Sequence, residues 1–356
     1  LSFFNKNNSS LPVISTEVSY VIKKRRGEIC SPYLTKTFKH NLKTMTIKEI
    51  FDLGIELGIK NDLRGSAKVK KNLKRVQDQF DNLDAKKKKD FDKQRLENPY
   101  MDSQILFDSK KEVKKVLVGV DIDTSELLLA KELGDIDLVI AHHPIGKGLS
   151  HLHDVMHLQA EVMADYGVPI NVAQSLLKIR IDEVARGVNP ANHYKTPMAA
   201  ELLKQGLINV HTPCDNLVAS FLKKNIENKK FEYVHEVLEA LGKIPEYEIA
   251  KKQGIGPRLF AGSPENYCGR IAITEITGGT EGSAQMYEKL AAAGVGTIIG
   301  MHMSEEHKKE AEKHHINAII AGHISSDSIG INLFLDQLEK KGIEVVANSG
   351  LIRIKR

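Results

Sequence analysis

Residues 138–145 constrain the fold of this chain most, because they form an apolar run that ends in two histidines and a proline. An unbroken apolar run of this length is typical of a strand that is buried on both faces, as in a parallel sheet. Pro144 cannot donate a hydrogen bond to a neighbouring strand and therefore ends regular pairing. The run predicts a buried strand whose end presents His142 and His143 to a polar site.

Alternating strands and helices around this run predict an α/β fold with a parallel sheet. Residues 116–120 form a predicted strand, Thr124 caps the predicted helix that follows, and residues 136–141 form the next strand. Strand, helix and strand in this order are typical of parallel pairing. Residues 208–211 form another short predicted strand, which a further helix follows.

The last third of the chain returns to the same alternation. Its predicted strands occupy residues 270–276, 295–300, 316–321 and 343–347. Residues 138–143 and 318–323 resemble each other, since both combine an apolar strand, a small residue and a histidine. The sequence therefore predicts two related α/β halves with parallel-rich sheets, each delivering a histidine at the carboxyl end of a strand, where open α/β sheets place ligand sites.

Two stretches predict helical insertions in this pattern, at about residues 66–97 and 150–205. In the first, apolar residues recur four and three apart on an otherwise charged helix: Val69, Leu73, Val76, Phe80 and Leu83. This seam indicates a helix that packs on its own protein or on a neighbouring subunit. A nucleic-acid arm is the other interpretation, but its aromatic residues are limited to Phe80 and Phe91.

The second insertion predicts one helix over residues 152–166, a break at Pro169 and further helices beyond it. Thr196 and Pro197 suit the N-cap and the first position of the last of these helices.

We expect the folded domain to begin near Met45 and to extend to residue 356. Thr46 and Glu49 form a capping-box pattern before an amphipathic helix. Residues 1–44 have no sustained apolar period and no apolar segment with a small-residue cleavage site. We therefore expect a loose N-terminal extension and no secretory signal.

The formal net charge of +5 is unevenly distributed, because residues 1–44 carry about +6 and residues 66–97 about +5. The rest of the chain is acidic overall, which disfavours a nucleic-acid partner for the predicted core. No apolar run approaches the length of a membrane span, so we expect no membrane partner. Three cysteines lie far apart without CxxC spacing, which favours a reducing, cytoplasmic location.

Histidine and aspartate side chains follow the ends of three predicted strands: His142 and His143, then His211 and Asp215, then His323 and Asp327. Imidazole and carboxylate without thiolate suit zinc, iron, manganese, cobalt or nickel. Too few protein ligands to saturate two ions leave positions for water, as in catalytic sites. Two ions that share a hydroxide would supply a nucleophile at neutral pH.

The motifs His142-His143-Pro144, His211-Thr-x-x-Asp215 and Gly322-His323-x-Ser-Ser-Asp327 resemble the signatures of the NIF-three-like dinuclear-metal proteins, often described as GTP cyclohydrolase I type 2 homologues. The resemblance runs from about Met45 to the C-terminus. It implies two divalent metal ions held by five ligands, with His211 close by: His142, His143, Asp215, His323 and Asp327. It also implies a homo-oligomer, a ring-like hexamer whose metal sites face inward.

One position departs from the family pattern, because Asp327 stands where the family usually has a glutamate, one methylene longer. Within the second insertion, His153, His157 and Glu161 are spaced to share one helix face. They are candidates for further ligands, for proton-transfer groups or for plain polar surface. We name His211 and Glu161 as candidates for supporting the ligands, and a metal-bound water as the nucleophile.

Three neighbouring features leave alternatives open. His302 follows a predicted strand and is a candidate for supporting the metal site. Asp121 and Asp123 either support the site or cap a helix. Residues 278–282 resemble a phosphate-cradling loop, but they lack the Lys-Ser/Thr of a P-loop and equally suit a plain turn.

We therefore expect a metal-dependent hydrolase that acts on a small nucleotide-like or phosphorylated substrate. The alternative is a non-catalytic metal-binding regulatory or scaffold protein, which the two basic segments favour slightly. A calcineurin-like phosphoesterase is a weaker interpretation, since the Asp-x-His and Gly-Asn-His-Asp/Glu motifs of that class do not occur.

Overall fold

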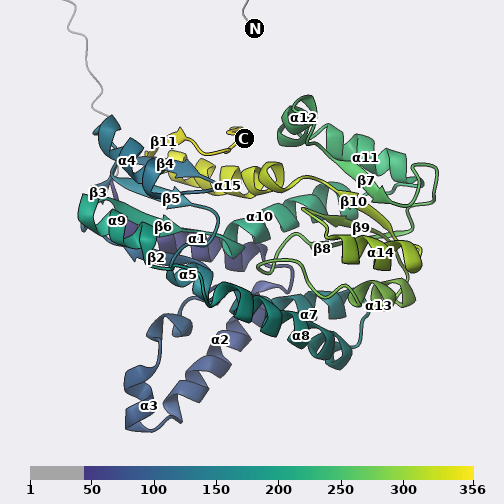
Figure 1. The fold of residues 1–356 in the computed structure, drawn as a ribbon, viewed down its shortest axis with the longest axis horizontal. Helices are drawn as coiled ribbons and strands as arrows, with labels where there is room; N and C mark the ends of the chain where they lie inside the picture. Colours follow the sequence, from purple (N-terminus) through teal and green to yellow (C-terminus); the bar gives the residue numbers. More distant parts are fainter. Residues whose placement is uncertain (1–43) are drawn as a thin grey trace, which may run out of the picture. The chain divides into compact units, whose positions relative to one another are not determined.

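The computed structural model describes residues 44–356, which form two parallel-rich sheets with helices on their faces (Figure 1). The predicted loose extension, residues 1–44, lies outside the described residues except for its last residue. Within the described part of the chain, no helix is both long enough and apolar enough to cross a membrane.

The first sheet has the strand order β11–β4–β5–β6–β2, with the edge strand β2 antiparallel to β6. Its strands are β2 (Gln104–Phe107), β4 (Lys115–Gly119), β5 (Leu138–Ala141), β6 (Gly206–Asn209) and β11 (Glu344–Ala347). The parallel pairing of β4 with β5 confirms the predicted strand–helix–strand order. The prediction that the last strand belongs with the C-terminal strands is wrong, because β11 pairs with β4.

The second sheet has the order β7–β10–β9–β8, with the edge strand β7 antiparallel to β10. Its strands are β7 (Arg258–Ala261), β8 (Arg270–Glu275), β9 (Val295–Gly300) and β10 (Asn317–Ile320). The parallel pairings of β8 with β9 and of β9 with β10 confirm the predicted α/β class of this half. A small separate ribbon pairs β1 (Met45–Thr46) with β3 (Glu112–Val113).

Helices cover both faces of the first sheet, because alternate residues of each strand point to opposite faces. Leu117 packs with α4 (Thr124–Leu133) and α9 (Lys195–Leu203). Its neighbours Val116 and Val118 pack on the other face, against α1 (Ile47–Asn61), α10 (Thr212–Leu222) and α15 (His323–Lys340). The buried strand around residues 138–141 is therefore enclosed on both sides, as its apolar run predicted.

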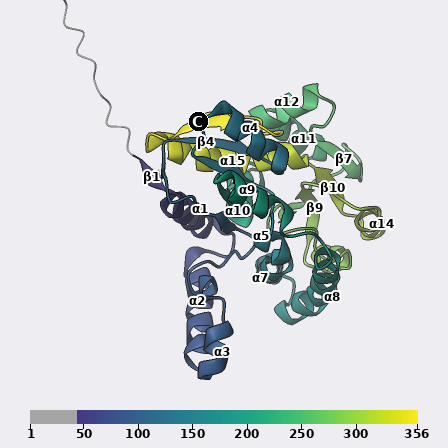
Figure 2. The ribbon, with the colours of Figure 1, turned by 60° about the vertical axis from the view of Figure 1, so that its left-hand side comes forward.

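Helices α10 and α15 also pack against the second sheet, so they lie between the two sheets (Figures 1 and 2). Val218 of α10 and Ile329 of α15 share a core with Ile273 and Ile319 of that sheet. The same face carries α11 (Val234–Gly242) and α12 (Pro245–Lys252), and the opposite face carries α7 (His157–Asp165), α8 (Ile170–Val188), α13 (Met286–Ala292) and α14 (Glu305–Lys313).

Both stretches that were predicted as helical insertions form helices, and these helices lie outside the sheets. Residues 66–97 form α2 (Ser66–Asp81), α3 (Ala85–Asp90) and a 3-10 turn (Lys93–Leu96), and α2 and α3 extend away from the sheets in both views (Figures 1 and 2). Of the apolar seam on α2, only Val69 is fully buried. Residues 150–205 contain α6 (Leu152–Val155) to α9, and α5 (Lys147–Ser150) directly precedes them.

The predicted start of a helix is correct where the capping side chain contacts only residues close to it in the sequence. Thr46 and Glu49 form the predicted capping box of α1. The predicted caps of α4 and α9 are wrong. Asp123 caps α4, and its carboxylate also accepts a hydrogen bond from the hydroxyl of Thr196 at 2.8 Å. That tertiary contact occupies Thr196, and α9 begins at Lys195, two residues before the predicted first helical position at Pro197.

Helix α10 approaches its two neighbours so closely that glycine is required at both contacts. A Cβ atom on Gly330 of α15 would overlap the carbonyl oxygen of Cys214, and one on Gly58 of α1 would lie 2.7 Å from the Cα of Pro213. These contacts fix the start of α10 between α1 and α15.

We predict that Gly330→Ala lowers the free energy of unfolding by about 1–3 kcal/mol, because the added methyl group forces α10 and α15 apart. The matched control is Gly187→Ala on α8, where a Cβ atom meets nothing within 4 Å. We expect that substitution to leave stability unchanged or raise it by about 0.4–1 kcal/mol. Urea unfolding of both variants measures the difference, and equal stabilities would contradict the close approach.

Candidate metal centre

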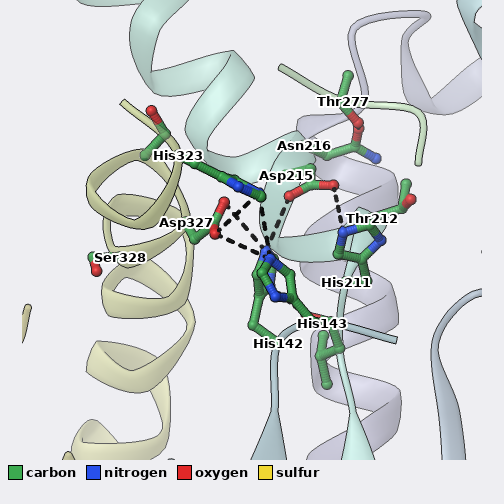
Figure 3. Close-up of polar contacts among 12 residues, drawn as sticks. His142, His143, His211, Thr212, Asp215, Asn216, Thr277, His323, Asp327 and Ser328 are labelled. Carbon is green, nitrogen blue, oxygen red and sulfur yellow. Dashed lines mark hydrogen bonds and ion pairs between the residues drawn. The ribbon is translucent and has the colours of Figure 1, made fainter. Parts of the chain in front are cut away.

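Three pairs of polar side chains converge where the two sheets face each other across α10 and α15 (Figure 3). His142 and His143 follow the end of β5. His211 is the N-cap of α10, and Asp215 lies in its first turn. His323 is the first residue of α15, and Asp327 lies one turn further along. The two metal-ligand groups found in the described residues are His142 with His211 and Asp215, and His142 with His143 and Asp327.

His142 is held so that one ring nitrogen faces the carboxylates. Its backbone N–H donates to the carbonyl of Gly119 at 3.0 Å, which continues the strand contact between β5 and β4. Its Nδ1 lies 3.1 Å from the carbonyl oxygen of Val210, and a carbonyl only accepts, so Nδ1 carries the proton. The Nε2 is left as a lone-pair donor, 3.3 Å from Asp215 and 3.5 Å from Asp327.

His143 is oriented in the same way by a carboxylate. Its Nδ1 donates to Asp121 at 2.7 Å, so of the two roles proposed for Asp121 the structure supports the contact with this histidine. The Nε2 of His143 lies 3.3 Å from the Nε2 of His323 and 3.4 Å from Asp327. The Nε2 of His323 is in turn 3.6 Å from the same oxygen of Asp327.

These spacings fit atoms that share a metal ion. Nitrogen and oxygen ligands about 2.1 Å from a tetrahedrally coordinated ion lie about 3.4 Å from each other. The three mutual distances among His143, His323 and Asp327 are 3.3, 3.4 and 3.6 Å. Two imidazole nitrogens that both present lone pairs at this distance repel one another unless a cation or a proton lies between them.

Asp327 links the two groups, because each of its oxygens faces different histidines. Oδ1 faces His142, whereas Oδ2 faces His143 and His323. Both oxygens, and the Nε2 of His142, are buried without a hydrogen-bond partner among residues 44–356. A buried polar atom left in this state costs about 1–3 kcal/mol, and more if it is charged. The donors therefore fit a divalent cation, and the shorter aspartate reaches all three imidazoles.

His211 is positioned by an aspartate that the sequence did not single out. The Oδ2 of Asp102, which is fully buried, accepts from the Nδ1 of His211 at 2.7 Å and from the hydroxyl of Thr212 at 2.6 Å. The hydroxyl of Ser103 accepts from the backbone N–H of His211 at 2.9 Å. A carboxylate behind a ligating histidine is a common arrangement, but 109 residues separate this pair in the chain.

Charge balance at the cluster shifts the pKa values of its members. Burial lowers the pKa of His142, but the carboxylates of Asp327 and Asp215 outweigh it and hold that pKa well above its usual range. Burial raises the pKa of Asp327, but His142 and His143 lower it by more than burial raises it. The pKa is therefore below its usual range, and this carboxyl stays ionised. Burial dominates at His323 and lowers its pKa.

Glu161 does not join the cluster. Its carboxylate instead accepts a hydrogen bond from Asn72 at 3.0 Å and lies 3.8 Å from Arg64 and 3.4 Å from Lys68. The predicted single helix over residues 152–166 is divided, since α6 ends at Val155 and α7 begins at His157. The proposed shared face is therefore wrong for His153, whereas His157 and Glu161 both lie on α7 and line the same cavity.

A small cavity lies next to the cluster, and the glycine-rich loop after β8 forms part of its wall. Thr277, Gly279 and Thr280 line this cavity together with His302 and members of the cluster. His302 donates from its Nδ1 to Glu281 at 3.0 Å, and its ring centroid lies 5.1 Å from that of His323. The loop thus contributes hydroxyl groups beside the cluster, and its Glu281 holds the imidazole of His302, which follows β9.

Comparison with solved structures finds a similar fold. A protein described as a NIF3 superfamily protein from Sphaerobacter thermophilus is 27% identical over 86% of this chain and 99% of its own, with a TM-score of 0.70. Reduced HcgD from Methanocaldococcus jannaschii is 18% identical over 69% of this chain and 87% of its own, with a TM-score of 0.43. Staphylococcus aureus hypothetical protein SA1388 is 18% identical over 72% and 92%, with a TM-score of 0.41. No family model and no curated protein sequence matches the chain.

We predict that Asp102→Asn lowers metal affinity by about 10–100-fold, because His211 loses the carboxylate that orients its ring. Isothermal titration of metal-free protein with zinc measures this change. Asp108→Asn is the control, since Asp108 lies in the same segment and contacts Lys110. Equal affinities in the two variants would show that Asp102 has no part in metal binding.

We predict that metal affinity falls on acidification by about tenfold per pH unit for each proton displaced. The raised pKa of His142 means that protons begin to compete for its Nε2 above the ordinary imidazole value of about 6.5. Asp327, with its lowered pKa, stays ionised over this range. Titrations in buffers of different ionisation enthalpy should detect proton release, and affinity that is independent of pH would contradict the prediction.

Proposed function

The chain belongs to the NIF3-like family, and from this premise we propose that it is a metal-dependent hydrolase with two divalent ions at the cluster. One ion would be held by His143, His323 and Asp327. The other would be held by His142, Asp215 and Asp327, with His211 beside it. The observation that carries the proposal is the carboxylate of Asp327, whose two buried oxygens face different histidines and lack hydrogen-bond partners among the described residues.

Bound there, divalent ions would act as Lewis acids and would activate water for attack at neutral pH. The ligand set is imidazole and carboxylate, which suits zinc, iron, manganese, cobalt or nickel. Asp215 and Asp327 contribute two negative charges inside a buried site, so they stabilise cations there. The Nδ1 of His142 donates a hydrogen bond to the carbonyl of Val210, and the Nδ1 of His143 donates to Asp121, so both rings keep a proton at Nδ1.

The adjacent cavity, of about 20 Å³, has room for about one water molecule, so the residues around it would orient an attacking water or the reacting group of a substrate. The hydroxyls of Thr277 and Thr280 line it, and Thr277 is itself fixed by donating to Asn216 at 2.7 Å. His302 holds a proton at Nδ1 against Glu281, which leaves its Nε2 to exchange a proton with a bound molecule. Hydroxyls and imidazoles of this kind suit a phosphorylated or nucleotide-like substrate. The GTP cyclohydrolase activity implied by the family resemblance is one member of that class.

Homo-oligomerisation, with a ring hexamer as the form that the family resemblance implies, stays a prediction. Exposed apolar side chains on the adjacent helices α4 and α9 support it, because a surface of this kind is costly in water: Leu128, Leu129, Leu133, Met198 and Leu202.

We predict that Asp327→Asn reduces the number of bound ions from two per chain to one or none. The amide is uncharged and has one oxygen, so it cannot present a negatively charged oxygen to His142 and another to His143. Turnover of a general phosphoester such as p-nitrophenyl phosphate should fall on the order of 100-fold or more. Glu339→Gln is the control, since this carboxylate lies near the other end of α15 and pairs with Arg353. Elemental analysis and rate measurements on both variants test the prediction.

The outcomes separate the alternatives. Two ions per wild-type chain with no turnover of phosphoesters or nucleotides would favour the non-catalytic metal-binding protein. Fewer than two ions per wild-type chain would overturn the dinuclear site itself.

A further inference from the structure

A cavity of about 420 Å³ lies between the first insertion and helices α6 and α7, apart from the candidate metal centre. Its walls come from α2, the segment at residues 91–101 and residues 154–161. The volume is in the range of about 300–1,000 Å³ that is common for small-molecule sites. The metal mechanism makes no use of this cavity.

Apolar side chains form one wall of the cavity. Leu73 and Val76 of the α2 seam, which are half-buried, line it together with Phe91 and Leu158. The ring of Phe91 is fixed against Phe80, with the ring centroids 5.0 Å apart. This wall suits a flat aromatic or heterocyclic body.

Positive charge lines the cavity beside the apolar wall. Arg95 lies in the lining and pairs with Asp154 at 2.6 Å. Arg75 also lies in the lining but forms no ion pair or side-chain hydrogen bond with any residue from 44 to 356. An anionic group on a ligand would provide the guanidinium of Arg75 with a partner.

One carboxylate oxygen in the lining has an ion-pair partner but no hydrogen bond. The Oε2 of Glu161 is buried and accepts no hydrogen bond from the described residues, although the Nζ of Lys68 lies 3.4 Å away. The other oxygen, Oε1, already accepts from Asn72. An N–H group on a ligand would satisfy Oε2.

From these features we propose that the cavity binds a small aromatic anion with N–H donors, of the size and chemistry of a nucleoside monophosphate. The ring packs against Val76 and Phe91, the ring N–H groups donate to Glu161, and the anionic group pairs with Arg75 and Arg95. The site is separate from the metal cluster, so it does not depend on the proposed hydrolase activity.

Two chains of contacts connect the cavity to the metal cluster. In the first, Arg64 lines the cavity and donates to both oxygens of Asp62 at 2.8 and 2.9 Å. Asp62 accepts from Asn216 at 3.3 Å, and Asn216 accepts from Thr277 beside the cluster. Asn216 directly follows the candidate ligand Asp215 in the chain.

The second connection runs through the backbone. Asn98, Pro99 and Met101 line the cavity, and the next residue, Asp102, holds His211. The side chain of Asn98 donates to the carbonyl of Ser103 at 2.9 Å, so the lining segment is fixed to the residues behind the metal cluster. We expect a ligand that alters these contacts to change metal affinity, and thermodynamic linkage then requires the metal to change ligand affinity by the same factor.

The test is isothermal titration of the full-length protein with AMP, GMP, CMP and UMP, both metal-loaded and metal-free. We expect one site per chain for at least one nucleotide and an affinity that differs about fivefold or more between the two forms. Arg75→Glu should weaken binding about tenfold or more, because a charge-assisted contact becomes repulsive. Val76→Trp should abolish binding by filling the cavity.

Lys70→Glu is the matched control, because it makes the same charge change on α2 but lies outside the cavity lining. Circular dichroism and the unfolding temperature show whether each variant is folded. Absence of binding by all four nucleotides overturns the site, and so does binding that Arg75→Glu and Val76→Trp leave unchanged, which would assign the ligand to the metal cluster. Equal affinities in the metal-loaded and metal-free forms would overturn the linkage.

Discussion

The buried carboxylate of Asp327 is the constraint on which the rest of the candidate metal centre depends. A negative charge enclosed in protein is unfavourable unless compensating positive charge lies next to it. Three imidazoles from two different strand ends surround this carboxylate, and the contacts among them match the spacing of atoms around an ion. Asp327 can occupy this position only because α15 begins at the end of β10 and packs against α10, where Gly330 permits the close approach.

The centre belongs to neither half of the molecule alone. β5 and β6 of the first sheet lead into His142, His143 and α10, whereas β10 of the second sheet leads into α15. The helices α10 and α15 share cores with both sheets, so the cluster is assembled only when the two halves pack together. The return of β11 to the first sheet further ties the second half to the first.

A second layer of contacts determines what the histidines can do. A carbonyl or a carboxylate fixes the Nδ1 of His142, His143 and His211, so that each ring directs its Nε2 toward the cluster. This arrangement orients the ligands before an ion binds, which reduces the entropy lost on binding. Asp102, which belongs to this layer, follows the segment that lines the cavity under the first insertion. The insertion is thereby joined to the residues behind the candidate metal ligands.

The sequence by itself determined the α/β class, the approximate positions of the parallel strands and the motifs that follow them, although β6 ends at Asn209, two residues before the predicted end at His211. These follow from local rules, since an apolar run of strand length and the proline after His143 act within a few residues. The candidate ligands could be named because each one lies directly at a strand end or one helical turn beyond it.

Only the tertiary structure decided which side chains meet. His211 and Asp102 are 109 residues apart and His143 and His323 are 180 apart, and no local pattern encodes such contacts. The same reason explains the wrong predictions. Glu161 has the spacing of a supporting residue but pairs with Arg64 and Lys68, and β11 follows the C-terminal strands in sequence but pairs with β4. Spacing along the chain identifies groups that can do chemistry, whereas the packing of distant elements chooses their partners.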